Sequence, residues 1–460
     1  MLSKKNVYFL GGGGIGMSAL MRYFLAQGKN VAGYDKTQTH LTDKLLTEGA
    51  ELNFEDEVKN IPAAFQNKED SLIVYTPAIP DNSPQLNFFK NEGYALFKRS
   101  EILGIITQSN YNIAVAGTHG KTTISSMVAH CLKYCGYPMT AFLGGVSKNL
   151  GSNYYHDRNS KVTVIEADEY DRSFLKLSPN IISVSAADAD HLDIYGTEEE
   201  MQRTFREFLN ENLQKDGSAI IEKKLEGVLG NTFETYSLTD VSADYFVSNL
   251  KVEGSVFSAD FNWDGGIQKN VILGLPGLHN MENGLVTFAI IQKMGIAPEK
   301  IKEALGAYSG VERRFDIHIK TKKCVYIDDY AHHPQEITSL LLSVKKMYPG
   351  KKVTGVFQPH LFSRTKDFLE GFAKALELLD TVVLLDIYPA REVPIEGIDS
   401  ALLLSKIKKN SKMLCSKKEM HDYISNRDCD VVLTIGAGDI GMEVETMKQN
   451  LLNRLNIKEL

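Results

Sequence analysis

The stretch that decides the fold is AVAGTHGKTTISSMV, from Ala114 to Val128. A short apolar run leads into a glycine-bounded loop, and the residues that follow can form a helix. Such loops bind phosphate because backbone N–H groups and the amino-terminal end of a helix point at the oxygens. The longer pattern, Gly-x-x-x-x-Gly-Lys-Ser/Thr, needs glycine at position 115, where this sequence has Val115. The strand before the loop and the helix after it still favour binding of an ATP-type phosphate over a chance turn.

The loop carries the residue types that a magnesium–nucleotide site needs. Lys121 can neutralise the β- and γ-phosphates, and the Thr122 hydroxyl can hold Mg²⁺. Glu166 ends an apolar run in VIEADEYD and can supply a further oxygen, with Asp168, Glu169 and Asp171 as alternatives. His191, in DADHLD after the next predicted strand, is another candidate ligand or phosphate contact. The loop residues that we expect to bind ATP are Gly117, Thr118, His119, Gly120, Lys121, Thr122 and Thr123.

A second glycine turn lies at the amino terminus. NVYFL is a predicted strand, GGGGIG follows it, and a predicted helix leads to the strand NVAGYD. Gly11, Gly13 and Gly16 match Gly-x-Gly-x-x-Gly, and Asp35 lies about 20 residues further on, where a ribose hydroxyl is bound in dinucleotide-binding folds. The pattern predicts a phosphate or ribose site. The alternative is a tight turn that needs glycine only for packing.

The composition is that of an ordinary globular enzyme. A chain of 460 residues is too long for one hydrophobic core, so about three domains are expected. The net charge of −7 and the lack of a long basic run argue against a nucleic-acid partner. Five cysteines without a Cys-x-x-Cys motif are expected to be free thiols in a reducing cytoplasm. No run of about 18 apolar residues occurs, so no membrane span is expected.

Strands and helices alternate along the chain, which predicts an α/β fold with parallel sheets and sites at the strand carboxyl ends. We expect a Rossmann-like domain over 1–104, a central P-loop ATPase-type α/β domain over 105–310, and a Rossmann-like carboxy-terminal α/β domain over 311–460. Predicted strands lie in the ranges 6–10, 30–35, 71–80, 112–117, 161–171, 180–196, 324–334, 351–360, 381–392 and 430–440. The region 215–275 is rich in strand-forming residues but harder to divide.

Polar residues gather after the strands of the third segment. The predicted strand CVYIDD ends at Asp329; Tyr330, His332 and His333 follow it directly, and Arg364 follows another strand. Such a cluster suits the carboxylate of a second substrate or a transferred phosphate. Zinc is disfavoured because no third His or Cys ligand lies at a suitable spacing. In the central segment, Asn280 and Asn283 are three residues apart on one predicted helical face, where they could bind an adenine edge or cap the helix.

The ordered set of motifs resembles the Mur ligase family. It comprises GTHGKTT, EADEYD, DADHLD, HNMEN, RRF, DDYAHHP, QPHLFSR and DIYPARE, and it covers essentially the whole chain. Each motif is weak alone, but their order is specific. The family's phosphate loop is the short Gly-x-x-Gly-Lys-Thr-Thr form, which would account for Val115. One departure is Leu361, where some relatives carry arginine.

The resemblance implies roles for individual residues. Lys121 would contact the β- and γ-phosphates, Thr122 and Glu166 would hold one magnesium ion, and Glu166 and His191 a second. Arg314 would reach the γ-phosphate from the domain junction. The other residues expected to bind ATP are Asn280, Asn283 and, at the ribose, Asp329. Those expected to bind the substrates are Gly11, Gly13, Gly16, Asp35 and Thr76 for the uridine nucleotide, and Tyr330, His332 and Arg364 for the amino acid.

The implied reaction is phosphoryl transfer followed by acyl transfer, with ATP and Mg²⁺ as cofactors. Within the family, QPHLFSR and DIYPARE favour members that join L-alanine to the lactyl carboxylate of UDP-N-acetylmuramate in peptidoglycan synthesis, here as a cytoplasmic monomer or homodimer. The nearest alternative is a recycling ligase that joins a tripeptide to the same nucleotide sugar. A nicotinamide-dependent dehydrogenase would leave GTHGKTT without a role, and a nucleotide-dependent binding switch would leave the third cluster unexplained. We expect domain closure about linkers near 104 and 311 to shield the acyl phosphate.

Overall fold

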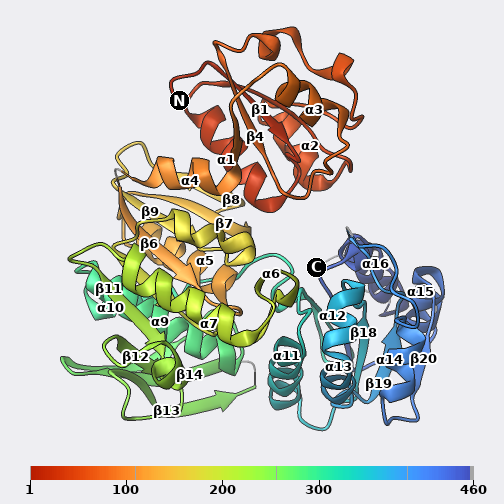
Figure 1. Ribbon diagram of the computed structural model, residues 1–460. Coiled ribbons are helices and arrows are strands. Elements are labelled where there is room, and N and C mark those ends of the chain that lie inside the picture. The colour runs from red at the N-terminus through yellow and green to blue at the C-terminus, as the bar shows by residue number, and fades with distance from the viewer. Residues whose placement is uncertain (1, 109, 255, 391, 456–460) are drawn as a thin grey trace. The chain divides into compact units, whose positions relative to one another are not determined.

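The computed structural model describes residues 2–108, 110–254, 256–390 and 392–455. Within these residues the strands form three sheets, and helices cover them (Figure 1). The chain forms two compact units. One consists of Met1–Ser248, Asp260–Val271 and Asn283–Tyr308, and the other of Asn249–Ala259, Ile272–Glu282 and Ser309–Leu460. The predicted three-domain α/β fold is confirmed by these sheets and by the comparisons reported below.

The first sheet is parallel throughout and has the order β3-β2-β1-β4-β5. Its centre is β1 (Asn6–Leu10), which is buried along its whole length, and α1 (Ile15–Ala26) follows the glycine turn. The predicted strands at 6–10 and 30–35 are confirmed, and 71–80 is strand only in its first half. The other elements are β2 (Asn30–Tyr34), α2 (His40–Thr47), β3 (Glu51–Asn53), β4 (Ser71–Tyr75), α3 (Pro84–Asn91), β5 (Leu96–Lys98) and α4 (Arg99–Thr107).

The second sheet has the order β15-β14-β13-β12-β11-β10-β6-β9-β7-β8. Its centre is β6 (Tyr111–Ala116), which lies between β10 (Ile181–Val184) and β9 (Val162–Glu166) and is parallel to both. The carboxyl ends of these three strands therefore meet at one edge. At one side the sheet also holds an antiparallel pair, because β7 (Met139–Ser147) turns back into β8 (Ser152–His156).

The rest of this segment completes the sheet and its helical cover. The region 215–275, hard to divide from sequence, holds five of the strands. The elements are α5 (Lys121–Tyr134), α6 (Leu192–Tyr195), α7 (Glu198–Glu207), β11 (Ser218–Glu222), α8 (Glu226–Leu229), β12 (Glu234–Ser237), β13 (Tyr245–Glu253), β14 (Val256–Trp263), β15 (Gly266–Ile272), α9 (Leu278–Lys293) and α10 (Pro298–Gly306).

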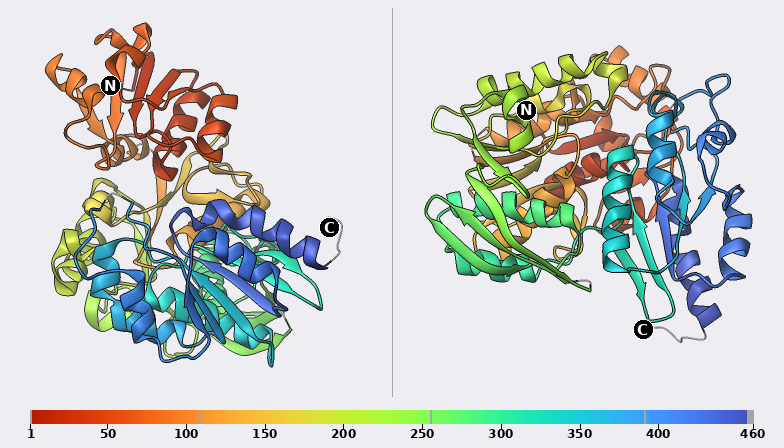
Figure 2. Two further views of the ribbon diagram at one scale, coloured as in Figure 1. Left: turned by 90° about the vertical axis from the view of Figure 1, so that its right-hand side faces the viewer. Right: turned by 90° about the horizontal axis from the view of Figure 1, so that it is seen from below.

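The third sheet has the order β16-β17-β21-β18-β19-β20 and is parallel except at β16. Its strands run side by side in the left view of Figure 2, in blue, with the last helix beside them. The elements are β16 (Asp316–Lys320), β17 (Val325–Asp329), α11 (Pro334–Met347), β18 (Val353–Phe357), α12 (Phe362–Asp367), α13 (Leu369–Leu376), β19 (Thr381–Leu384), α14 (Ser400–Lys406), β20 (Lys412–Leu414), α15 (Lys417–Ser425), β21 (Val431–Ile435) and α16 (Val444–Leu455).

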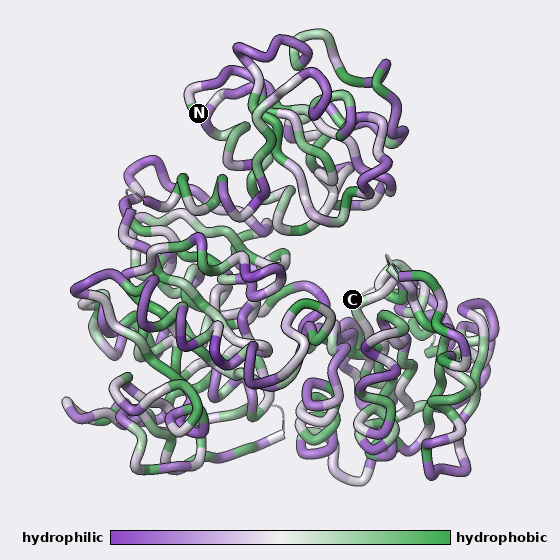
Figure 3. Tube along the Cα trace, viewed as in Figure 1, coloured by the Kyte–Doolittle hydropathy of each residue, from purple (hydrophilic) through white to green (hydrophobic). Residues whose placement is uncertain are grey.

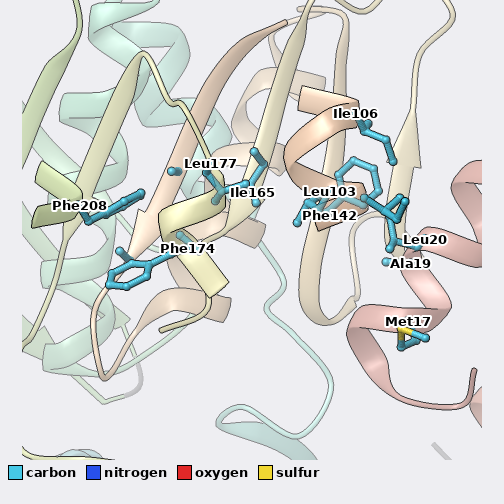
Figure 4. Close-up of a cluster of buried hydrophobic side chains, with 14 of the residues drawn as sticks. Met17, Ala19, Leu20, Leu103, Ile106, Phe142, Ile165, Phe174, Leu177 and Phe208 are labelled. Carbon is cyan, nitrogen blue, oxygen red and sulfur yellow. The ribbon is translucent and has the colours of Figure 1, made fainter. Parts of the chain in front are cut away.

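One continuous core joins the first sheet's helices to the second sheet. Figure 4 shows Leu20 of α1 and Leu103 of α4 beside Phe142 of β7, and all three belong to the same buried cluster. Deeper in the cluster, the rings of Phe174 and Phe208 lie 4.6 Å apart. Each such side chain contributes about 1.5–3 kcal/mol by leaving water. Figure 3 shows hydrophobic and hydrophilic stretches interspersed along the chain, and no helix among the described residues is both long and apolar enough to cross a membrane.

Candidate active site

The phosphate loop lies between β6 and α5, as predicted. Val115 is a fully buried residue of β6 and pairs with Glu166 of β9, so the loop begins two residues later than in the longer pattern. Gly117 has φ +125° and Gly120 has φ +84°. Both values lie where residues with a Cβ are strained. α5 starts at Lys121, directly after the loop, so its first N–H groups face the place where a phosphate would lie.

The loop is fixed to the end of the neighbouring strand β10. The N–H of Thr118 donates to the carbonyl of Ala186 over 3.0 Å, and the Ser185 hydroxyl donates to the carbonyl of His119. A Cβ at Gly117 would overlap the Ser185 hydroxyl and lie 2.9 Å from the Ala186 nitrogen. Glycine is therefore required at 117 both by the backbone angle and by the close approach of a second chain segment.

The two residues predicted to hold one magnesium ion lie together. The Thr122 hydroxyl donates to Glu166 Oε1 over 3.2 Å, and the N–H of Gly144 in β7 donates to Glu166 Oε2 over 3.0 Å. A hydroxyl and a carboxylate are hard oxygen donors of the kind that Mg²⁺ takes alongside phosphate oxygens. The described residues contain no group of three or more His, Cys, Asp or Glu side chains that could hold a metal ion without such outside ligands.

The other carboxylates of EADEYD, which sequence alone left as alternative metal ligands, each contact a basic side chain. The pairs are Arg99–Asp168 at 2.8 Å, Lys121–Glu169 at 2.7 Å and Lys98–Asp171 at 2.6 Å. Glu166 instead meets the hydroxyl of Thr122. The partners printed for the four carboxylates therefore differ, and Glu166 is the one that contacts a hydroxyl of the phosphate loop. The contacts of Arg99 and Glu169 were not foreseen, because they join residues 69 and 48 positions apart.

His191 precedes α6 and has φ +50°, an uncommon angle for a non-glycine residue. Its Nε2 lies 3.8 Å from Glu169 and 3.7 Å from Asp190. The carboxylates recorded beside His191 are therefore Glu169 and Asp190, and not Glu166 as the two-metal arrangement would suggest. Lys121 shares Glu169 with His191. Burial alone would lower the pKa of Lys121, but the charges of Glu169 and Glu166 hold it above its ordinary value.

The amino-terminal glycine turn is packed against the predicted substrate residues. The N–H of Gly13 donates to Asp35 Oδ2 over 2.7 Å, so this carboxylate also stabilises the turn. A Cβ at Gly11 would overlap Thr76, and one at Gly16 would lie 2.8 Å from the Arg99 guanidinium. Thr76 and Arg99 thus lie at the same turn as the three predicted glycines.

The two asparagines of HNMEN both lie in α9 but have different surroundings. Asn280 Nδ2 donates to the carbonyl of Pro276 over 2.7 Å, which is the capping contact considered as an alternative to adenine binding. The Asn283 side-chain oxygen lies close to the phosphate loop, 3.1 Å from where a Cβ of Gly120 would be. Asn283 is therefore placed beside the loop, whereas the hydrogen bond recorded for the Asn280 side chain stabilises the start of its own helix.

In the third domain, Tyr330 and His332 follow β17 and form one cluster with Arg314. The Arg314 guanidinium lies 5.1 Å from the centre of the Tyr330 ring and 3.6 Å from a Glu336 oxygen. The rings of Tyr330 and His332 meet edge to face at 5.4 Å. His332 Nδ1 lies 3.5 Å from a second Glu336 oxygen. Glu336 was not predicted, yet it holds both basic side chains.

Arg364 extends this cluster to the next two strands. Its Nη1 lies 3.5 Å from His360 Nδ1, and the His360 ring stacks on Tyr388 at 5.7 Å. The rings of His332 and His360 are 6.2 Å apart. Residues after β17, β18 and β19 therefore meet at one sheet edge, as expected for parallel strands. His360 and Tyr388 lie inside the quoted motifs QPHLFSR and DIYPARE but were not chosen as site residues.

Asp329, expected at the ATP ribose, is buried at the end of β17. Its carboxylate accepts hydrogen bonds from the N–H of Phe315 over 2.6 Å and from the N–H of Ala331 over 2.8 Å. Burial raises its pKa to about 6, while the charge of Arg314 acts in the opposite direction. The carboxylate therefore stabilises two turns of the backbone in this structure.

Three family models match successive parts of the chain. Residues 6–111 match "Mur ligase family, catalytic domain", residues 115–291 match "Mur ligase middle domain", and residues 313–438 match "Mur ligase, glutamate ligase domain". The chain belongs to the Mur ligase family. The resemblance based on ordered motifs is confirmed, and all five cysteines are free thiols as expected.

Two relatives that match nearly the whole chain carry the same name. A UDP-N-acetylmuramate–L-alanine ligase of Parabacteroides distasonis is 46% identical over 98% of both chains, and one of Christiangramia forsetii is 47% identical over 98% of both. The solved structure of a UDP-N-acetylmuramate–alanine ligase from Thermotoga maritima covers 98% of this chain and 99% of its own, with a TM-score of 0.82 at 28% identity. A murein peptide ligase from Psychrobacter arcticus covers 99% and 100%, with a TM-score of 0.71 at 22% identity, which supports the shared fold.

Proposed function

We propose that this Mur ligase joins L-alanine to the lactyl carboxylate of UDP-N-acetylmuramate, with ATP converted to ADP and phosphate, in peptidoglycan precursor synthesis. The observation that carries the proposal is identity of 46–47% along 98% of the chain to ligases of that name. For the nearest alternative, joining of a tripeptide to the same nucleotide sugar, the murein peptide ligase at 22% identity shows a shared fold alone. The alanine reaction is therefore favoured.

We propose that each of the three sheets belongs to a part of the chain that binds a different ligand. Residues 1–104 bind the uridine nucleotide, with Gly11, Gly13, Gly16, Asp35 and Thr76 at the turn. Residues 105–310 bind ATP at the phosphate loop, and residues 311–460 bind the amino acid. The matched family ranges 6–111, 115–291 and 313–438 support boundaries near these positions. We expect a cytoplasmic enzyme.

The first chemical step is phosphoryl transfer. The lactyl carboxylate attacks the γ-phosphorus of ATP, the bond to the β-phosphate oxygen breaks, and an acyl phosphate and ADP form. Lys121 stabilises negative charge on the β- and γ-phosphates, the N–H groups at the start of α5 bind their oxygens, and Arg314 binds the γ-phosphate. The contribution of this chain is mainly positioning and neutralisation of charge. Asn283 supports the loop, and the family resemblance assigns Asn280 and Asp329 to the nucleotide as well.

The second step is acyl transfer. The neutral amine of L-alanine attacks the activated carbonyl, and the tetrahedral intermediate releases phosphate. The cluster of Tyr330, His332 and Arg364 suits a small zwitterion, because it offers a guanidinium for the carboxylate beside aromatic surfaces. His191 is a candidate to accept the proton from the ammonium group, since carboxylates lie within 4 Å of its ring.

The residues present fit a magnesium ion at one position. Thr122 and Glu166 would hold it with phosphate oxygens, since their oxygens are 3.2 Å apart. When bound, the ion supplies neutralisation of the triphosphate charge. A second ion held by Glu166 and His191 has weaker support, because the histidine lies beside Glu169 and Asp190.

The test is ADP release by the purified chain with ATP, Mg²⁺ and UDP-N-acetylmuramate, comparing L-alanine with the L-Ala-D-Glu-diamino-acid tripeptide. Release that needs both the nucleotide sugar and alanine is expected. Release only with the tripeptide would transfer the assignment to the recycling reaction, with the same fold and ATP site. No release with either acceptor would overturn the proposed ligase activity.

A pair of lysine variants tests the ATP site itself. Lys121→Ala removes the charge beside the phosphates and is expected to reduce turnover by about 10²–10³-fold or more. Lys133→Ala changes an exposed lysine in the last turn of the same helix and is expected to leave turnover within about twofold. Equal turnover in the two variants would show that Lys121 has no phosphate role.

A further inference from the structure

Lys121 is folded back onto its own loop. Its Nζ donates to the carbonyl of Gly117 over 2.6 Å and to Glu169 Oε1 over 2.7 Å, and the carbonyl of Thr118 lies 3.4 Å away. A lysine ammonium has three N–H donors, so its capacity is nearly satisfied by these protein atoms. A phosphate can take the amine only by displacing some of these contacts.

The acidic partner is itself constrained. The Glu169 side chain is 1% exposed, and its backbone carbonyl accepts a hydrogen bond from the Tyr195 hydroxyl over 2.6 Å. Its second oxygen, Oε2, is buried and has no hydrogen-bond partner among the described residues. A buried carboxylate is costly unless it is paired and hydrogen-bonded, so this side chain is only half satisfied. The other basic group beside it is His191, with Nε2 at 3.8 Å from Oε1.

We propose that Glu169 is a positioning residue that holds Lys121 in a resting place and releases it when the phosphates of a nucleotide bind. The inference rests on the proposed ATP site. After release, Glu169 pairs with His191, the basic ring already beside it. The carboxylate thus has two alternative partners, the lysine before a nucleotide binds and the histidine afterwards.

This arrangement makes nucleotide binding a competition for one amine. Glu169 and the phosphates are both anions, and the lysine cannot hold both with the same donors. Replacing the carboxylate by an amide of the same shape weakens the resting pair and leaves Lys121 more available. Nucleotide should then bind more tightly. A purely structural ion pair predicts the opposite, because its loss would disorder the loop and weaken binding.

The experiment measures ADP binding by calorimetry at fixed ionic strength, with chelator present so that no magnesium contributes. Glu169→Gln is expected to bind ADP about tenfold more tightly than the unchanged chain, from the difference between charged and neutral hydrogen bonds. The matched control is Glu222→Gln, another buried carboxylate at a strand end, whose neighbour is Lys224 at 3.6 Å; we expect a change within about twofold. Unchanged or weaker binding in folded Glu169→Gln would overturn the inference.

Glu169→Asp is a second test, used if Glu169→Gln does not fold. It keeps the charge but shortens the side chain by one methylene, so the pair with Lys121 lengthens and ADP should bind about threefold more tightly. If Glu169→Gln is unfolded by its thermal transition, Glu169→Asp decides, and unchanged or weaker binding there overturns the inference.

A double-mutant cycle separates the lysine pair from simple repulsion between Glu169 and the nucleotide. In a Lys121→Met background, Glu169→Gln should change ADP affinity by less than about twofold, because no resting pair remains to be broken. A tenfold gain that persists there would overturn the inference in favour of direct repulsion. If Lys121→Met alone leaves ADP affinity unchanged, the proposed ATP site fails. If it weakens binding while Glu169→Gln has no effect, only the resting-pair inference fails.

Discussion

The guanidinium of Arg99 donates a hydrogen bond to the carboxylate of Asp168, with 2.8 Å between Nη2 and Oδ2. Arg99 begins α4, and its side chain also lies against Gly16 in the amino-terminal glycine turn. Asp168 lies two residues after Glu166, the predicted magnesium ligand. One arginine thus joins the turn proposed for the uridine nucleotide to the acidic loop beside the phosphate loop.

We predict that Arg99→Ala raises the apparent KM for UDP-N-acetylmuramate by about tenfold or more, because the guanidinium that lies against Gly16 and is held by Asp168 is lost. The effect on stability should be small, since the pair is partly exposed. Steady-state kinetics with the nucleotide sugar varied provide the measurement. Arg203→Ala removes a similar ion pair, to Glu200, from the exposed side of α7 and serves as control. An unchanged KM in Arg99→Ala would place the nucleotide sugar elsewhere.

Alanine substitutions at two glycines test how closely the phosphate loop packs against the neighbouring segment. Gly117 and Gly136 both have positive φ, +125° and +71°, but a Cβ at Gly117 meets residues just after β10 whereas one at Gly136 meets no atom within 4 Å. Gly136→Ala should cost about 1 kcal/mol of unfolding free energy from backbone strain alone. Gly117→Ala should abolish detectable ADP binding. Calorimetry and thermal unfolding measure both, and normal ADP binding by Gly117→Ala would contradict the close packing described here.

Arg364→Ala is expected to raise the alanine concentration needed for half-maximal ADP release by about tenfold, with less effect on the ATP requirement. The reason is loss of the guanidinium proposed to bind the alanine carboxylate. Lys366→Ala is the control: it removes one positive charge, as Arg364→Ala does, from an exposed position two residues later on α12. It should leave the alanine requirement unchanged. Equal alanine curves for all three chains would exclude Arg364 from the amino-acid site.

The raised pKa of Asp329 predicts that the free energy of unfolding depends on pH. Its pKa is raised from 3.8 to about 6 in the folded chain, so between these values the folded state holds a proton that the unfolded state has lost. The free energy of unfolding therefore falls as pH rises from about 4 to 6. The shift corresponds to about 3 kcal/mol. Hydrogen exchange of β17 amides, corrected for intrinsic rates, should show this fall.

The Asp329→Asn variant has no carboxyl group to titrate at this position, so the fall in β17 protection between pH 4 and 6 should largely disappear. Asp367→Asn alters an exposed carboxylate on α12 and should keep the fall. If the two variants show the same pH dependence, a group other than Asp329 titrates in this range.

Local sequence was enough to predict the elements that meet at the sites. Buried apolar runs such as NVYFL and glycine-bounded loops such as GTHGKTT have strong local preferences, and β1, β6 and α5 lie where they were expected. The strands β7 and β8 were missed as a hairpin, because their pairing depends on contact between segments and not on local composition. The strands within 215–275 were undivided for the same reason.

The residues of the candidate site also fall into two groups, those that a motif predicted and those that only the fold revealed. Residues inside motifs, such as Thr122 and Glu166, were predicted to meet and do. Arg99 and Glu169 were recognised only from tertiary contacts: Arg99 contacts Asp168, and Glu169 contacts Lys121. A charged residue outside a recognised pattern looks like ordinary surface until the fold shows what it touches.

Gly144 of β7 gives the proposed magnesium carboxylate its place, since the backbone N–H donates to Glu166 and a Cβ there would overlap both carboxylate oxygens. Position 144 therefore does not tolerate the substitutions that most strand positions accept. A single methyl group at residue 144 would displace Glu166 without altering any side chain proposed to bind ATP. In a survey of natural or drug-selected variants, position 144 belongs with the phosphate loop itself, although no motif marks it.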